Sequence, residues 1–315
     1  MNYPIELQAP DISAYQSGNA GTEYVHQFDS GKPGPHVCVN ALMHGNEICG
    51  AIALDHLLKA ELRPKRGTLT LCFVNVNAYL NFDPNTPGES RFVDEDMNRV
   101  WVEDRLGSNE NTVELQRARV LRPIFDGVDY LLDIHSMSTL SEPILLCNGL
   151  RSERALARSM TYPRTVACGS GHIVGKRLIE YTPFNDAGND KTALLIECGQ
   201  HWARETGPIA LDTALYFLRA LDMLPDGFFA AHVNCATPPA QQILDVTHGY
   251  TTKTRDFEFA ETFVGLEEFA EEGTLIATDG DEEIRTPYPR CVLVMPHPIR
   301  EQNRRVLRFA RHSEN

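Results

Sequence analysis

The sequence lacks the patterns that mark membrane proteins, secreted proteins and small disulfide-rich proteins. No hydrophobic run approaches the length of a membrane-spanning helix. The N-terminus has no basic stretch followed by an apolar core, so we expect no signal peptide. No two of the eight cysteines form a Cys-x-x-Cys pair, and several lie inside apolar runs, as buried free thiols do. Free thiols are typical of a reducing compartment, so we expect a cytoplasmic protein.

Positive charge is also scarce. The chain has 29 lysine and arginine residues against 43 aspartate and glutamate residues, which gives a net charge of -14. An acidic protein repels nucleic-acid phosphates and anionic membrane surfaces, so neither is an expected partner. A chain of 315 residues, 42% of them hydrophobic, can bury a large core. This length favours two domains, or one large domain with an appendage.

Short apolar runs alternate with helix-like segments over residues 1–224. The runs predict buried strands at His36–Met43, Thr68–Val76, Asp129–His135 and Ala193–Cys198. Apolar residues at helical spacing predict helices at Glu47–Ala60, Thr112–Phe125, Arg151–Met160 and Pro208–Leu224. Buried strands that alternate with helices predict an α/β domain, with a parallel sheet covered by helices on both faces.

The pattern changes after residue 224. Residues 225–315 contain short β-like runs separated by glycine, proline and acidic turns, namely Gln242–Val246, Gly273–Ala277 and Cys291–Met295. Such runs predict a small β-rich C-terminal domain. No internal repeat is visible in the sequence.

Two predicted strands end on histidines. The carboxyl ends of parallel strands are where such sheets carry their functional residues, and His44 and His135 lie there. Glu47 lies on the turn into the next helix, so its carboxylate and the imidazole of His44 can face one ion; Gly45 is expected to allow the tight reversal. Two histidines and one glutamate form a catalytic zinc set, although either histidine alone could be an ordinary strand-end residue. Asp133 either orients His135 or faces the other side of its strand.

Three polar residues, Arg91, Asn98 and Arg99, lie in and after a long loop at residues 77–91. Long loops in compact domains are often functional. Two arginines and an amide beside a metal would bind an anion and stabilise an oxyanion. The alternative is a surface segment of internal ion pairs, because three acids lie between these residues.

Glu197 interrupts an apolar run, residues 194–199. A carboxylate is costly to bury without a partner, and burial raises its pKa, which suits a general base acting on water. The alternative is a strand-end acid that points into solvent.

The order of these motifs is HxxE, then R-x6-NR, then D-x-H, then IExG. This order resembles the succinylglutamate desuccinylase/aspartoacylase family, which is related to the zinc carboxypeptidases. The resemblance extends over about residues 36–200 and weakly to Glu272–Ala277. It implies a zinc carboxypeptidase-like fold, with a mixed, mostly parallel sheet sandwiched by helices and a smaller C-terminal β domain.

The resemblance also implies a reaction and roles for the site residues. The reaction is hydrolysis of the amide bond of a small carboxylated N-acyl amino acid, such as N-succinylglutamate or N-acetylaspartate. Arg91 would polarise the scissile carbonyl, Asn98 and Arg99 would hold a substrate carboxylate, and Glu197 would be the general base. One Zn2+ ion per chain would be bound by three ligands: His44, Glu47 and His135. A homo-oligomer is possible.

The sequence departs from the aspartoacylase branch of that family, which carries a further arginine shortly before its catalytic glutamate. Here the segment 182–191 has no arginine, and the nearest cations are Arg177 and Lys191. Three residues after the glutamate also differ: Cys198, Gln200 and His201.

Two other functions remain open from the sequence. A carboxypeptidase-like zinc peptidase acting on small peptides would share the metal and the base. A catalytically inactive zinc-binding module is the alternative outside the enzymes, although such proteins usually lose a ligand or the base. A structural zinc site is disfavoured, because those sites prefer four closed ligands, often cysteines.

Overall fold

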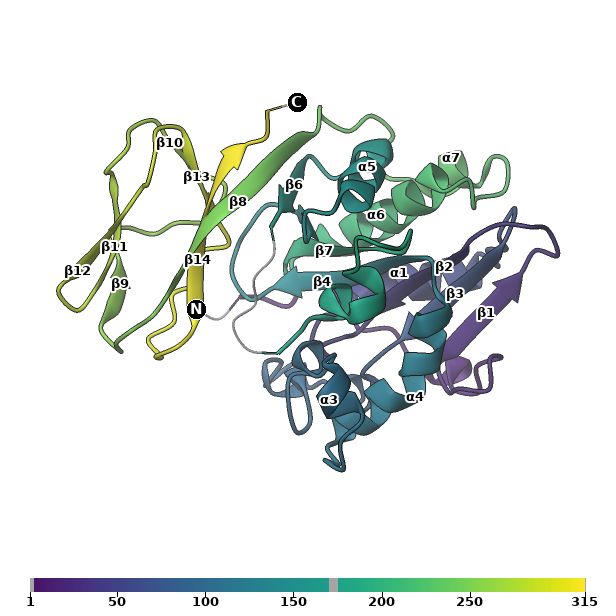
Figure 1. Ribbon diagram of the computed structural model, residues 1–315. Coiled ribbons are helices and arrows are strands. Elements are labelled where there is room, and N and C mark those ends of the chain that lie inside the picture. The colour runs from purple at the N-terminus through teal and green to yellow at the C-terminus, as the bar shows by residue number, and fades with distance from the viewer. Residues whose placement is uncertain (1–2, 170–174, 315) are drawn as a thin grey trace.

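The computed structural model describes residues 3–169 and 175–314 and is built on one large sheet, of order β1-β3-β2-β4-β7-β5-β6-β8-β14-β13-β10 (Figure 1). Its strands are β1 (Val25–Asp29), β2 (His36–Ala41), β3 (Thr68–Phe73), β4 (Tyr130–Met137), β5 (Ile144–Cys147), β6 (Thr165–Cys168), β7 (Thr192–Gln200), β8 (Gln242–Thr251), β10 (Glu268–Phe269), β13 (Cys291–Val294) and β14 (Arg305–His312). Strands β3, β2, β4 and β7 are parallel, whereas β5 is antiparallel to β7 and β1 is an antiparallel edge strand. The predicted mixed, mostly parallel α/β fold is confirmed.

Helices cover both faces of this sheet, which is why its central strands are apolar throughout. The helices are α1 (Ile48–Lys59), α2 (Val76–Tyr79), α3 (Glu103–Leu106), α4 (Val113–Gly127), α5 (Arg151–Met160), α6 (Thr206–Ala220) and α7 (Phe228–His232). Leu54 of α1, Leu156 of α5 and Leu215 of α6 belong to the core on one face. Leu115 and Phe125 of α4 belong to the core on the other face. Within the described part of the chain, no helix has the length and apolar character needed to cross a membrane.

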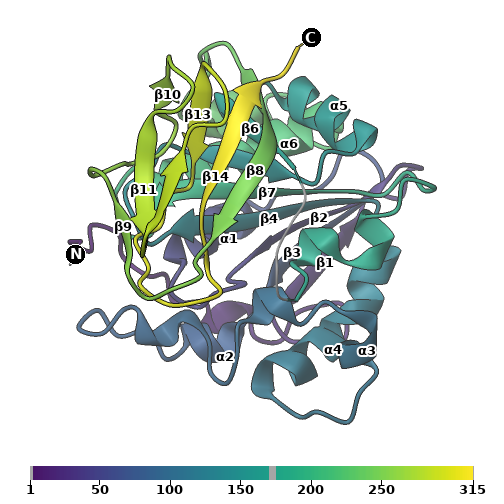
Figure 2. The same cartoon turned by 60° about the vertical axis from the view of Figure 1, so that its left-hand side comes forward.

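The chain after residue 225 continues the same sheet. Strand β8 pairs in parallel with β6, with Asp245 opposite Cys168, and β14, β13 and β10 then follow in antiparallel order (Figure 2). A second sheet contains β12 (Glu282–Arg285), β11 (Leu275–Asp279) and β9 (Phe257–Phe259). The C-terminal region is therefore β-rich, as expected. The division of the chain into domains at residues 1–224 and 225–315 stays a prediction.

One predicted strand is shorter in the structure because a polar side chain begins a helix. The strand predicted at Thr68–Val76 ends at Phe73, since the side chain of Asn75 accepts a hydrogen bond from a backbone amide in the first turn of α2. The loop predicted at residues 77–91 therefore begins inside a helix, and it ends in the 3-10 turn η2 (Glu89–Arg91). The sequence of residues 169–191 carries glycines and predicts an irregular segment, of which residues 170–174 lie outside the described residues.

Candidate metal centre and active site

Three neighbouring strands bring the predicted site residues together. Strand β4 lies between β2 and β7, and all three run parallel. His44 follows the end of β2, while His135 and Glu197 lie opposite each other in β4 and β7. These side chains therefore lie together at the carboxyl edge of the sheet, where the predicted strand ends indicate functional residues.

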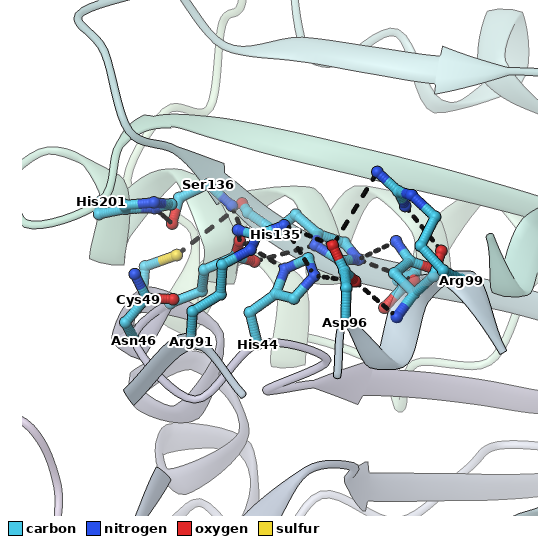
Figure 3. Close-up of polar contacts among 12 residues, drawn as sticks. His44, Asn46, Cys49, Arg91, Asp96, Arg99, His135, Ser136 and His201 are labelled. Atoms are coloured by element: carbon cyan, nitrogen blue, oxygen red, sulfur yellow. Dashed lines mark hydrogen bonds and ion pairs between the residues drawn. The ribbon is translucent and has the colours of Figure 1, made fainter. Parts of the chain in front are cut away.

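The carboxylate of Glu47 bridges two imidazoles. Its Oε1 lies 2.8 Å from Nδ1 of His44, and its Oε2 lies 2.9 Å from Nδ1 of His135 (Figure 3). All three side chains are buried, and one ligand atom from each lies within 4.8 Å of the others. One metal ion could therefore be held by His44, Glu47 and His135, as the sequence predicts.

Each imidazole is oriented by a second carboxylate on its other nitrogen. Nε2 of His44 lies 2.9 Å from Oδ1 of Asp96, and Nε2 of His135 lies 2.8 Å from Oδ2 of Asp133. This arrangement is common around metal-binding histidines, because it fixes the ring and directs the other nitrogen to the ion. Asp133 therefore lies on the same side of its strand as His135.

Asp96 could not be recognised as a site residue from the sequence alone. Asp96 is the last of three consecutive acids, and the other two have structural partners: Asp94 accepts the amide of Val113, and Glu95 pairs with Arg105. Only the fold of the loop distinguishes the acid that reaches His44.

The electrostatics of these groups suit a cation. Burial opposes ionisation of Glu47, but His44 and His135 hold its pKa well below the usual range. Burial likewise opposes ionisation of Asp96, whose pKa is nevertheless lowered by His44, Arg91 and Arg99. Two imidazole nitrogens and an ionised carboxylate are the donors of a catalytic zinc site. The side chains present therefore fit a zinc ion.

Gly45 is needed for a reason other than the predicted one. Its φ is not positive, so the reversal of the chain does not require glycine there. A Cβ at this position would lie 2.4 Å from backbone atoms of Ala78, Tyr79 and Ser90. The Gly45 amide also donates to the Arg91 carbonyl at 3.1 Å. Close packing of the loop backbone on the His44 turn therefore places Arg91 beside the candidate ligands.

Arg91 lies at the mouth of the site, with its side chain 35% exposed. Its Nη2 donates to Oδ2 of Asp96 at 3.1 Å and lies 3.0 Å from Nε2 of His44. Its Nη1 lies 3.6 Å from Oε1 of Glu47. The sequence left open that residues 91–99 only form ion pairs with one another. The Arg91–Asp96 pair is one of these, and it also holds the Arg91 guanidinium against the candidate ligands.

Asn98 and Arg99 lie on the adjacent 3-10 turn η3 (Met97–Arg99). Oδ1 of Asn98 accepts the amide of Leu178 at 2.9 Å, and this bond directs Nδ2 of Asn98 toward Nε2 of His135, 3.5 Å away. Nη2 of Arg99 lies 4.0 Å from Oδ2 of Asp96. The structure thus brings both residues to the site, where an amide donor and a cation are available to an anion.

Glu197 presents a carboxyl oxygen without a partner. Its side chain is partly exposed, but Oε2 is buried and has no hydrogen bond among the described residues. Burial raises the pKa of Glu197 to about 8, against the opposing effect of His135. A carboxyl group with a pKa near neutrality can both take up and release a proton under ordinary conditions.

A buried histidine lies behind the candidate ligands and was noted in the sequence only as a departure. Nδ1 of His201 lies 2.8 Å from Oγ of Ser136, and the Ser136 amide donates to Oε2 of Glu47 at 3.3 Å (Figure 3). Burial lowers the pKa of His201 to about 4, so its ring is neutral. His201 therefore supports the Glu47 carboxylate through Ser136.

Solved structures share this fold. The chain is 16% identical to succinylglutamate desuccinylase from Vibrio cholerae, with a TM-score of 0.67 over 92% of this chain and 86% of that chain. The ectoine utilization protein EutE (DoeB) from Ruegeria pomeroyi is 15% identical, with a TM-score of 0.64 over 93% and 92%. A succinylglutamate desuccinylase/aspartoacylase from Rhodobacter sphaeroides is 18% identical, with a TM-score of 0.63 over 90% and 87%. No curated protein sequence matches the chain.

The family follows from the sequence itself. Residues 33–225, more than half of the chain, match the model of the succinylglutamate desuccinylase/aspartoacylase catalytic domain. The chain therefore belongs to the succinylglutamate desuccinylase/aspartoacylase family, a family of deacylases that hydrolyse amide bonds in small acylated amino acids.

Proposed function

We propose that the protein is a zinc-dependent deacylase that hydrolyses the amide bond of a small N-acyl amino acid carrying a carboxylate. N-succinylglutamate and N-acetylaspartate are examples of this class. The proposed zinc ligands are His44, Glu47 and His135, with one ion per chain. The eight cysteines are free thiols, which supports a reducing, cytoplasmic setting.

One observation carries the proposal. A bridging carboxylate and two oriented imidazoles lie directly beside a buried carboxyl oxygen of Glu197 that has no hydrogen-bond partner in the described part of the chain. A set of metal ligands without a general base would also be found in a protein that binds zinc and catalyses no reaction. An unpaired acid with a pKa of about 8 next to that set provides the general base that hydrolysis needs.

The chain supplies the base and the oxyanion partner. A zinc ion, when bound, supplies Lewis acidity, which lowers the pKa of water and polarises a carbonyl group. Oε2 of Glu197 takes the proton of the attacking water and later gives it to the leaving nitrogen. Arg91, fixed by Asp96, donates hydrogen bonds to the carbonyl oxygen as it gains negative charge, and such donors are typically worth about 10²- to 10³-fold in rate.

Two residues hold the substrate. Nδ2 of Asn98 and the guanidinium of Arg99 offer a hydrogen-bond donor and a cation to one substrate carboxylate. Holding the carboxylate there fixes the amide against Glu197 and Arg91, which lowers the entropic cost of the reaction.

Two alternatives share parts of this site. A carboxypeptidase-like zinc peptidase on small peptides would use the same metal and base, so only substrates separate the two activities. An inactive zinc-binding module would not need Glu197 as a buried, unpaired acid.

The test is amine release by the zinc-loaded protein from a panel of substrates. The panel holds N-succinylglutamate, N-acetylaspartate, neutral N-acyl amines and small peptides. Deacylation of the carboxylated N-acyl amino acids is expected. Preference for the peptides would favour the peptidase, and no release from any compound would favour the binding module.

The matched variant is Glu197→Gln. It should bind zinc normally, because Glu197 is not a proposed ligand, and it should lose about 10²- to 10⁴-fold in kcat. Glu272→Gln, at an exposed position, is the control and should keep wild-type activity. Near-normal turnover by Glu197→Gln would exclude Glu197 as the base.

A further inference from the structure

Two cysteines, Cys147 and Cys168, lie directly opposite each other at the carboxyl ends of neighbouring strands. Cys147 is the last residue of β5 and Cys168 is the last residue of β6, and the two strands pair in parallel with these residues in register. Neighbouring strands lie about 4.7–4.9 Å apart, and residues in register share a face of the sheet. This spacing is within the Cα separation that a disulfide bond spans, about 4.4–6.8 Å.

The row of side chains that holds these thiols continues onto the next strand and reaches the surface there. Strand β8 pairs with β6 so that Asp245 lies opposite Cys168. Arg154 of helix α5 donates from Nη2 to Oδ1 of Asp245 at 2.5 Å. Both cysteines are 1% exposed, whereas the side chains of Arg154 and Asp245 are 28% and 33% exposed. A small oxidant can therefore approach Cys168 from the side of this ion pair.

The two thiols differ in acidity. Hydrogen bonding by the Cys147 thiol lowers the pKa of Cys168, and the Arg154 guanidinium lowers it further, against the effect of burial. The same hydrogen bond, together with burial, raises the pKa of Cys147 well above its usual range. The thiolate is the nucleophilic form of cysteine, and a neighbouring arginine favours that form. Cys168 is therefore suited to react first, with Cys147 beside it to react second.

Another pair of cysteines shows what is particular to this one. Cys49 of α1 and Cys198 of β7 are both fully buried. Burial, hydrogen bonding with Cys49 and the nearby Glu197 carboxylate all raise the pKa of Cys198 well above its usual range. Cysteines buried in such surroundings are inert. The Cys49–Cys198 pair should therefore stay reduced, and it provides an internal control.

We propose that Cys147 and Cys168 form a redox-active thiol pair that hydroperoxides oxidise to a disulfide. In a reducing compartment such disulfides are usually transient and redox-sensing, so the bond is expected to be reversible. Neither thiol has a role in the proposed hydrolysis, so this inference does not rest on the proposed function.

The chemistry takes two steps. The Cys168 thiolate attacks the terminal oxygen of the hydroperoxide, the O–O bond breaks, and Cys168 becomes a sulfenic acid. The other oxygen takes up the proton that Cys168 gave up and leaves as an alcohol, or as water when the oxidant is hydrogen peroxide. The Cys147 sulfur then attacks the Cys168 sulfur, and the hydroxyl group leaves with the Cys147 proton as water. The two thiols lose two electrons in all, and the hydroperoxide gains them.

The test treats the zinc-loaded protein with hydrogen peroxide, alkylates the remaining thiols in denaturant and identifies cross-linked peptides by mass spectrometry. A disulfide between Cys147 and Cys168 is expected, and a thiol reductant should restore both thiols. Cys49 and Cys198 should be alkylated as in the untreated protein. Absence of the Cys147–Cys168 disulfide, or equal oxidation of the Cys49–Cys198 pair, would overturn the proposal.

Four variants assign the roles within the pair. Cys147→Ser keeps Cys168 and should stop at the sulfenic acid, which a cyclic diketone traps, whereas Cys168→Ser should leave Cys147 unreacted. Arg154→Gln removes the guanidinium and should slow the loss of thiols by about 3- to 10-fold. Arg158→Gln removes the same charge from an exposed position of the same helix and should react at the wild-type rate. A wild-type rate in Arg154→Gln, or a sulfenic acid at Cys147 in place of Cys168, would contradict these roles.

Discussion

Replacement of Asp96 by asparagine removes one negative charge behind the proposed zinc ligand His44 and keeps an oxygen that can contact its ring. Asp96 Oδ1 accepts from the Asn98 amide at 2.9 Å and lies 2.9 Å from Nε2 of His44. An asparagine oxygen can still make both contacts, so the 3-10 turn and the ring orientation should persist. The charge that strengthens these bonds is lost, and the NH2 group that replaces Oδ2 can no longer accept the hydrogen bond from Nη2 of Arg91.

The size of the effect follows from these contacts. Hydrogen bonds to charged groups contribute about 1.5–3 kcal/mol, against about 0.5–1.5 kcal/mol between neutral groups, so the change costs His44 roughly 1.5 kcal/mol. This energy corresponds to about a tenfold weaker zinc affinity. The same range, about 10- to 100-fold, is typical when a carboxylate behind a metal-bound histidine is removed.

The assay is titration of the metal-free protein with zinc in competition with a coloured chelator. Asp94→Asn is the matched control, because Asp94 belongs to the same acidic run but accepts the amide of Val113 at the start of α4. It should alter stability slightly and leave zinc affinity unchanged. If Asp96→Asn binds zinc within twofold of wild type, then Asp96 does not orient His44 for the metal and this reading of the site is wrong.

Three further changes probe neighbouring parts of the site. Arg91→Lys should keep one zinc per chain by metal analysis and lose about 10²-fold in kcat, because the planar donor fork is gone; unchanged kcat would contradict its role. Gly45→Ala should cost about 1–3 kcal/mol of unfolding free energy in urea, since its Cβ would meet rigid backbone, whereas Gly88→Ala has no atom within 4 Å and should be tolerated. His201 has a pKa of about 4 in the folded protein and about 6.5 unfolded, so the folded state binds fewer protons between these values. His201 should therefore cost the metal-free wild type up to about 3 kcal/mol of unfolding free energy as the pH falls from 6.5 to 4. His201→Asn should remove this share of the pH dependence, whereas His248→Asn, at an exposed position, should keep it.

Much of the fold could be predicted because its central strands are short, apolar and followed by helices. The predicted helix Arg151–Met160 has the bounds that the sequence indicates. Strand-end positions also identified His44 and His135, since parallel strands end at one edge of a sheet.

Residues whose role depends on register or on loop packing could not be predicted. Asp96 is one of three adjacent acids, and which acid reaches His44 depends on how the loop folds over Gly45. Cys168 is one of eight cysteines, and the thiol that lies opposite it depends on the pairing of β6 with β5. Neither dependence leaves a periodic signal in the sequence.

The large sheet is continuous, but the proposed catalytic residues all lie in the first part of the chain. The proposed ligands, base and oxyanion partner all come from residues before 200, in the turn after β2, in strands β4 and β7, and in one loop. The C-terminal strands β8, β14, β13 and β10 extend the same sheet beyond β6 and hold none of these residues. A change at Asp96 should therefore lower zinc affinity, whereas a change in the C-terminal strands, which hold none of the proposed ligands, should leave zinc affinity intact.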